Sequence, residues 1–125
     1  MSNLIIKKCS NCGKMVRVLE CGDNGDCEIK CCGEKMRELT PNSVDAAIEK
    51  HVPTYEVNGD KIIVKVNHVM DEDHYIEWIS ILNGNKEKTV YFKPGEEATA
   101  SFCYYKGAIL YAYCNKHGLW KKEVE

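Results

Sequence analysis

Near its C-terminus the chain reads Tyr113-Cys114-Asn115-Lys116-His117-Gly118-Leu119-Trp120. This stretch separates two runs of β-forming residues, 109–113 and 119–122, so it predicts a turn between two strands. Cys114 and His117 have the Cys-x-x-His spacing typical of metal chelation, and Gly118 lets the backbone turn directly after them. Two ligands do not complete a metal site, so the other ligands must come from elsewhere in the chain.

The distribution of histidine and cysteine suggests where those ligands lie. The chain has four histidines, all downstream of residue 50: His51, His68, His74 and His117. Six of the eight cysteines instead lie in the first 32 residues: Cys9, Cys12, Cys21, Cys27, Cys31 and Cys32. This segregation predicts two separate metal sites with different ligand sets.

Downstream of residue 50 the sequence predicts one short strand after another. The segments 54–57 and 60–66 flank Asn58-Gly59, a favoured two-residue hairpin turn. Further strands are expected at 75–82, 89–92, 98–104, 109–113 and 119–122. About seven short strands separated by turn residues are typical of an antiparallel β-sandwich. Before them, a short helical turn is expected over residues 44–48, capped by Ser43.

The first 39 residues are expected to form a unit of their own. A segment shorter than about 40 residues rarely folds without a metal or disulfides. Cys9-x-x-Cys12-Gly13 and Cys31-Cys32-Gly33, separated by an alternating apolar run, predict a tetrahedral site of four thiolates. Zinc and iron both suit four sulfur ligands, and the adjacent pair Cys31 and Cys32 is expected to distort the tetrahedron.

Composition limits the classes of function. A net charge of −2 gives no reason to expect nucleic acid as a partner. The N-terminus lacks the pattern of a secretory signal, and no apolar stretch approaches the roughly 20 residues that span a membrane. We therefore expect a cytoplasmic protein with no membrane contact, whose eight cysteines stay reduced. A secreted disulfide knot is the alternative. Cys103, inside a predicted strand, is expected to be a small buried hydrophobe.

Every histidine falls at or beside the end of a predicted strand, where the loops of a sandwich bring distant residues together. With Cys114 the four imidazoles make five candidate ligands. Structural zinc closes at four ligands, so five indicate a redox-active metal with one coordination position left open, and imidazole suits iron. A blue-copper site is the competing interpretation, but it needs only two histidines.

Four groups of motifs follow one another along nearly the whole chain: Lys8-Cys9-x-x-Cys12-Gly13 with Cys31-Cys32-Gly33, Glu49-Lys50-His51-Val52-Pro53, His68 with His74-Tyr75-Ile76-Glu77-Trp78, and Cys114-Asn115-x-His117-Gly118-x-Trp120. Together they resemble desulfoferrodoxin, the two-iron class of superoxide reductase. The resemblance implies an all-β protein. A small desulforedoxin- or rubredoxin-like metal domain, residues 1–39, would precede an immunoglobulin-like antiparallel β-sandwich, residues 40–125. Val69 departs from the family, whose members often carry proline there.

The resemblance also implies two mononuclear irons per chain. One would be held by Cys9, Cys12, Cys31 and Cys32, although Cys27 lies near enough in sequence to be an alternative ligand. The other, ferrous, would be held by His51, His68, His74 and His117 with Cys114 as the axial ligand. The implied reaction is the one-electron reduction of superoxide to hydrogen peroxide, without production of oxygen.

In the family's loop, Glu49 is implied as a ligand of the oxidised iron and Lys50 as a cation over the open position. A rubredoxin-like electron donor and a homodimer are implied as partners. Two functions of other classes stay open: an iron electron-carrier module without turnover, and a zinc-ribbon adaptor. Colour separates them, since ferric iron on four thiolates is red and zinc is colourless.

Overall fold

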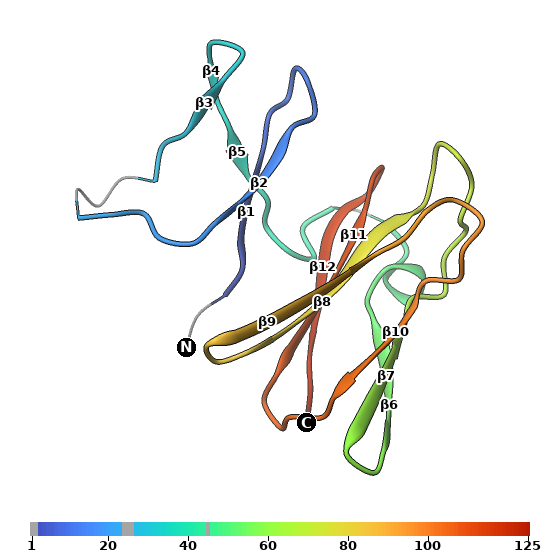
Figure 1. Ribbon diagram of the computed structural model, residues 1–125. Helices are drawn as coiled ribbons and strands as arrows, with labels where there is room; N and C mark the ends of the chain where they lie inside the picture. The colour runs from blue at the N-terminus through green and yellow to red at the C-terminus, as the bar shows by residue number, and fades with distance from the viewer. Residues whose placement is uncertain (1–2, 24–26, 45) are drawn as a thin grey trace. The chain divides into compact units, whose positions relative to one another are not determined.

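The computed structural model describes residues 3–23, 27–44 and 46–125, which form an all-β protein as predicted (Figure 1). Within these ranges the one helical element is a single 3-10 turn, η1 (Ile48–Lys50). None of the described segments contains a helix long and apolar enough to span a membrane. The chain divides into two compact units, Asn3–Thr40 and Pro41–Glu125.

The N-terminal unit has two small antiparallel sheets. The first has the order β2-β1-β5, formed by β1 (Ile5–Lys8), β2 (Met15–Val18) and β5 (Arg37–Glu38). The second pairs β3 (Lys30–Cys31) with β4 (Glu34–Lys35). The buried apolar side chains of this unit are few, namely Leu4, Ile6, Val18 and Met36 beside Cys9. So small a core needs additional cross-links to hold a fold.

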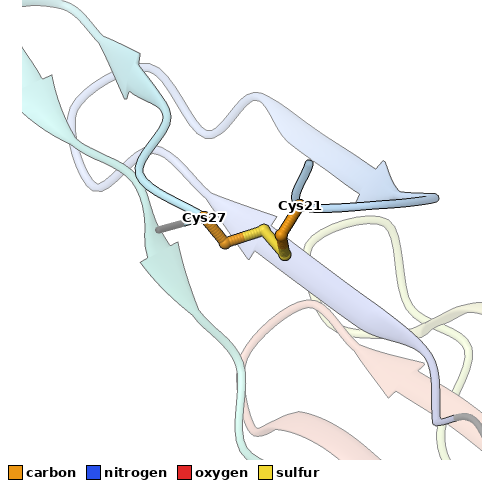
Figure 2. Close-up of a disulfide and its surroundings, with 2 residues drawn as sticks. All are labelled: Cys21 and Cys27. Atoms are coloured by element: carbon orange, nitrogen blue, oxygen red, sulfur yellow. A yellow bond between two sulfur atoms is a disulfide. The ribbon is translucent and has the colours of Figure 1, made fainter. Parts of the chain in front are cut away.

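One such cross-link is a disulfide between Cys21 and Cys27, which closes the segment between β2 and β3 (Figure 2). Their Cα atoms are 4.7 Å apart. Residues 24–26 of this segment lie outside the described residues. The disulfide corrects the expectation that all eight cysteines are reduced thiols, and it engages Cys27 away from the metal cluster. The expectation failed because it rested on composition, whereas the chain path brings these two thiols together.

The second unit is a sandwich of two antiparallel sheets with seven strands, which lie along the chain close to the positions predicted from the sequence (Figure 1). One sheet, β10-β7-β6, comprises β6 (Thr54–Asn58), β7 (Lys61–Lys65) and β10 (Thr99–Cys103). The other, β12-β11-β8-β9, comprises β8 (Ile76–Asn83), β9 (Lys86–Tyr91), β11 (Ile109–Cys114) and β12 (Gly118–Glu123). Gly59, at φ +65°, occupies the predicted hairpin turn between β6 and β7.

Alternate side chains of the strands point between the two sheets and form the core. Ile62 and Val64 of β7 meet Ile79 and Ile81 of β8, together with inward residues of β10 and β11. In β10 the inward positions belong to Ala100 and Phe102, so Cys103 points outward and is exposed. The expectation that Cys103 is buried is therefore wrong, because side chains alternate between the faces of a strand.

The site-bearing loops emerge where these strands begin or end. The predicted helical turn over 44–48 forms later, at η1, where Ala47 is the N-cap residue. Asp45, within the expected turn, lies outside the described residues. Because η1 is immediately followed by His51, it brings that histidine to the edge of the sandwich where β6 starts.

Candidate metal centres

Five potential donor atoms converge at one end of the sandwich. They come from His51, His68, His74, Cys114 and His117, and all lie within 4.8 Å of one another. His51 precedes β6, His68 follows β7, and His74 precedes β8. Cys114 ends β11, and His117 precedes β12. Because the strands are antiparallel, these positions fall at the same end of the sandwich.

The four imidazole rings form a closed circuit. Going from His51 to His68, His74, His117 and back to His51, successive ring centroids are 4.7 to 5.0 Å apart. The planes of neighbouring rings are inclined by 69° to 87°. The Cys114 sulfur lies 3.4 Å from Nε2 of His68 and 3.9 Å from Nδ1 of His117. The arrangement suits one cation held by four nitrogens and one sulfur.

Backbone carbonyls fix which ring nitrogens are available. Nδ1 of His51 lies 2.7 Å from the Ala47 carbonyl oxygen, and Nδ1 of His68 contacts the Val69 carbonyl in the same way. A carbonyl only accepts, so each Nδ1 must carry the proton and each Nε2 keeps a free lone pair. That free Nε2 of His51 lies 3.1 Å from Nδ1 of His117. Hydrogen bonds from a ring N–H group to a backbone carbonyl are a usual way in which metal-binding histidines are oriented.

His74 supplies the test of whether a cation fits. Its Nε2 atom is buried and has no hydrogen-bond partner among the described residues. A buried polar atom without a partner costs about 1–3 kcal/mol. His74 is one of the convergent residues, and a metal ion bound at this nitrogen would satisfy it. The site therefore fits a metal ion.

The rings are also kept in the neutral form that binds metals. Burial lowers the pKa of His51, His68 and His74 below the ordinary value of 6.5. Positive charge on neighbouring imidazoles adds to this effect for each of the three. Cys114 is fully buried beneath the rings, whereas His68, His74 and His117 are half-buried. The thiol thus lies on the protein side of the site and solvent on the other side.

Trp120 supports two of the ligands, a role that sequence reasoning did not assign. Its indole stacks on the His51 ring, with centroids 5.0 Å apart and planes inclined by 25°. Its Nε1–H group donates to the His117 carbonyl oxygen at 3.0 Å. The sequence signal was present, since Trp120 lies three residues after His117 in the quoted motif.

In the N-terminal unit, Cys9, Cys12, Cys31 and Cys32 bring their four sulfurs within 4.8 Å of one another. The Cys12 and Cys31 sulfurs are 3.7 Å apart, and those of Cys31 and Cys32 are 3.9 Å apart. The adjacent pair is accommodated because Cys32 adopts a left-handed backbone, φ +55°, which a non-glycine residue rarely adopts. The backbone of Cys32 thus carries local strain beside the cluster.

The cysteines of this cluster differ in pKa. Hydrogen bonds from the backbone amides of Cys12 and then Asn11 lower the pKa of Cys9 to about 7. Hydrogen bonding with Cys12 and then with Cys9 and Cys31 raises the pKa of Cys32 to about 12. Four thiolates so close together repel one another, and a cation between them would relieve that repulsion. Four soft sulfur donors suit zinc or iron.

Glu49 and Lys50 lie in η1, directly before His51, and both side chains are exposed. Glu49 is not one of the five convergent residues. It lines a surface cavity of about 370 Å³ together with Ile48, Val52, Pro53, Thr54, Tyr55 and Lys122. Its charge nevertheless raises the pKa of His51 slightly against the larger effect of burial, so it acts near that ring.

Comparison with known proteins gives consistent matches. The family model described as desulfoferrodoxin matches residues 43–123. A desulfoferrodoxin of Syntrophotalea carbinolica is 43% identical over 124 residues, covering 96% of each chain. A superoxide reductase of Pyrococcus horikoshii is 37% identical over 113 residues, covering 72% of this chain and 98% of that protein. The crystal structure of the superoxide reductase from Treponema pallidum is similar with a TM-score of 0.72 at 25% identity, covering 97% of this chain and 99% of that one.

Proposed function

Because this chain belongs to the desulfoferrodoxin family, we propose that it is a superoxide reductase whose sandwich holds a catalytic ferrous ion. The proposed ligands are His51, His68, His74, His117 and Cys114. The observation that carries the proposal is the closed circuit of four imidazoles above one buried thiol, with ring nitrogens free to bind. Five donors exceed what a structural zinc site uses, and four nitrogens exceed what blue copper uses.

The proposed reaction combines superoxide, one electron and two protons to give hydrogen peroxide. Bound ferrous iron would supply the electron. The protein's own groups prepare the site: Cys114 is held in the core by β11, and the half-buried side of the rings faces solvent, from which the anion arrives. The exposed ammonium of Lys50 attracts that anion to the site. Water supplies the protons, and Glu49 is proposed to bind the oxidised ion.

We propose that the four thiolates of the N-terminal unit hold a second iron ion in a separate centre. Domain roles follow: residues 1–39 form the desulforedoxin-like domain and residues 40–125 the catalytic domain. We further propose that a rubredoxin-like protein donates the electron. The proposed location is the cytoplasm, and the proposed assembly is a homodimer.

The deciding experiment is metal analysis of anaerobically prepared protein, followed by rapid mixing of the reduced protein with superoxide. The expected result is two irons per chain and one peroxide for each superoxide consumed, with no oxygen released. A dismutase would instead give one peroxide and one oxygen for every two superoxide ions. One zinc without iron would favour the adaptor function, and two irons without superoxide reactivity would favour the electron carrier.

A further inference from the structure

Asn115, between two proposed ligands, joins the loop of Cys114 and His117 to the loop of His74. Its side-chain oxygen accepts a hydrogen bond from the Tyr75 amide at 3.0 Å, and its side-chain nitrogen donates to the Asp73 carbonyl at 3.0 Å. Its backbone amide also donates to the Tyr75 carbonyl at 3.2 Å. Asn115 therefore contacts the backbone on both sides of His74.

These bonds occur where regular strand pairing ends. β11 and β8 pair residue by residue as far as Tyr113 and Trp78, but the next pair is Cys114 with Ile76, so one residue of β8 bulges. His74 lies beyond the last pair, in a turn closed on itself by backbone hydrogen bonds between Asp71 and His74. Beyond that pair, the Asn115 backbone amide bonds the Tyr75 carbonyl, and the Asn115 side chain adds two further bonds between the end of β11 and this turn.

The chemistry of the amide suits this task. A primary amide donates and accepts at once, whereas a carboxylate only accepts and a methyl group does neither. Because the two bonds run to different residues, they fix the orientation of the turn as well as its distance. His74 has no hydrogen bond at Nε2 among the described residues, so the placement of its ring depends on the backbone on either side and on the neighbouring His68 and His117 rings.

We propose that Asn115 is a positioning residue of the second metal centre, which sets His74 against Cys114 and His117. This inference rests on the metal-binding part of the proposed function and not on the reaction with superoxide. Loss of outer hydrogen bonds that orient a ligand typically weakens metal binding about 10- to 100-fold. The Asn115→Ala variant is therefore expected to weaken iron binding at this centre by that factor and to alter its ferric absorption spectrum.

Asn42 provides a matched control in the same unit. Its side chain bonds both backbone groups of Lys121 in β12, at 2.9 and 3.4 Å, and its backbone amide donates to the Leu119 carbonyl at 2.9 Å. The number and type of bonds are the same, but they flank Trp120, which supports His51 and His117, and not a ligand itself. Asn42 also has φ +58°, so Asn42→Ala adds backbone strain and should reduce fold stability at least as much.

The experiment uses the iron-loaded full chain. Thermal unfolding, the ferric spectrum and competition for iron with a chelator are measured for wild type, Asn115→Ala, Asn115→Asp and Asn42→Ala, with the red four-thiolate centre as internal reference. Asn115→Ala should weaken binding and shift the spectrum, and Asn115→Asp, which keeps only the acceptor, should do so less. Asn42→Ala should lower the unfolding temperature and change both signals less than Asn115→Ala does, because its bonds flank Trp120 and not a ligand.

The proposal is overturned if Asn115→Ala binds iron as tightly as Asn42→Ala does, with the wild-type spectrum. If Asn115→Ala does not fold, Asn115→Asp decides: wild-type affinity and spectrum there refute the proposal. Hydrogen exchange at the Tyr75 amide, expected to speed up in Asn115→Ala, reports on the bond without iron. Wild-type protein that binds iron but ignores superoxide would reject the proposed reaction and leave this inference intact.

Discussion

His51 is bound on three sides by groups from different parts of the sandwich. The Ala47 carbonyl sets its tautomer, the Trp120 indole supports its face, and His117 lies next to its free nitrogen. Each contact restricts the rotation of the ring before a metal binds, so the ring loses less conformational entropy on binding. The neighbouring Lys50 and Glu49 have no such restraint, because both are exposed in a single turn of 3-10 helix.

Lys50→Ala is expected to slow the second-order reaction of the reduced protein with superoxide. For a separation of about 7 Å, Coulomb's law gives a rate effect between about threefold and about fiftyfold, from water to an effective dielectric of 20. The side chain is exposed, so we expect the lower end and a flatter dependence on ionic strength. Stopped-flow kinetics over a salt series measures both.

Two variants control for this result. Lys50→Arg keeps the charge and should keep most of the rate. Lys61→Ala removes the same charge at the opposite end of the β6–β7 hairpin and should change little. If Lys50→Ala matches wild type in rate and salt slope, Lys50 is an ordinary solvated lysine.

Glu49→Ala should leave the first encounter with superoxide nearly unchanged and alter the absorption spectrum of the oxidised protein. The reason is that a carboxylate is a hard oxygen donor, which prefers ferric to ferrous iron. Glu56→Ala, in the adjoining strand β6, serves as control. A ferric spectrum equal to that of wild type would exclude Glu49 from coordination.

At the scale of elements, the β11–β12 hairpin carries two ligands in one tight turn. Gly118 has φ +84°, and a Cβ atom there would lie 3.2 Å from Cγ2 of Val44. The turn therefore needs glycine for its backbone, and a side chain there would also press on Val44. The Cys114–Gly118 pair is the last in the ladder of this hairpin, so a shift there reaches both ligands.

Gly118→Ala is expected to lower the free energy of unfolding by about 1–2 kcal/mol through left-handed strain and to weaken iron binding at the second centre. Gly84→Ala is the control: φ is +56° and nothing lies within 4 Å, so it carries similar strain in the β8–β9 turn without ligands. Denaturant unfolding and chelator competition are the measurements. Equal loss of iron in both variants would mean that general destabilisation, and not turn geometry, is responsible.

At the scale of the whole molecule, the two units have separate cores and separate donor clusters. The N-terminal unit relies on four cysteines and a disulfide, whereas the sandwich has a large apolar core. Because of this independence, the role of each metal centre can be tested with point variants of the full chain, without truncation.

Cys9→Ser in the full chain should abolish the red colour and leave most of the superoxide reactivity. Cys9 is buried, and its sulfur accepts a hydrogen bond from the Cys12 amide. Replacing this sulfur therefore disrupts the four-sulfur cluster directly. Metal analysis and rapid mixing on the same sample check both expectations. Cys103→Ser, an exposed cysteine outside either cluster, should change neither. Loss of reactivity with the second iron still bound would show that the N-terminal centre is obligatory.

The sequence by itself determined the all-β class, the positions of the sandwich strands along the chain and the candidate residues of both donor clusters, with Cys27 left as an alternative at the first. It did so because side-chain alternation and turn residues are local signals, and because thiols and imidazoles are few. The hairpin at Asn58-Gly59 and the turn between Cys114 and His117 are examples in which the local signal was sufficient.

Only the tertiary structure decided which ring nitrogen His51 and His68 present, that Cys21 pairs with Cys27, and that Cys103 faces outward. It also decided that Asn115 contacts the backbone around His74 and that Trp120 stacks on His51. The contacts of Asn115 and Trp120 depend on how backbone segments distant in sequence approach one another. The outward position of Cys103 follows instead from which face of β10 packs on the core. A carbonyl or amide supplied by a neighbouring loop has no signature in the residue type that donates it, so spacing along the chain could not reveal it.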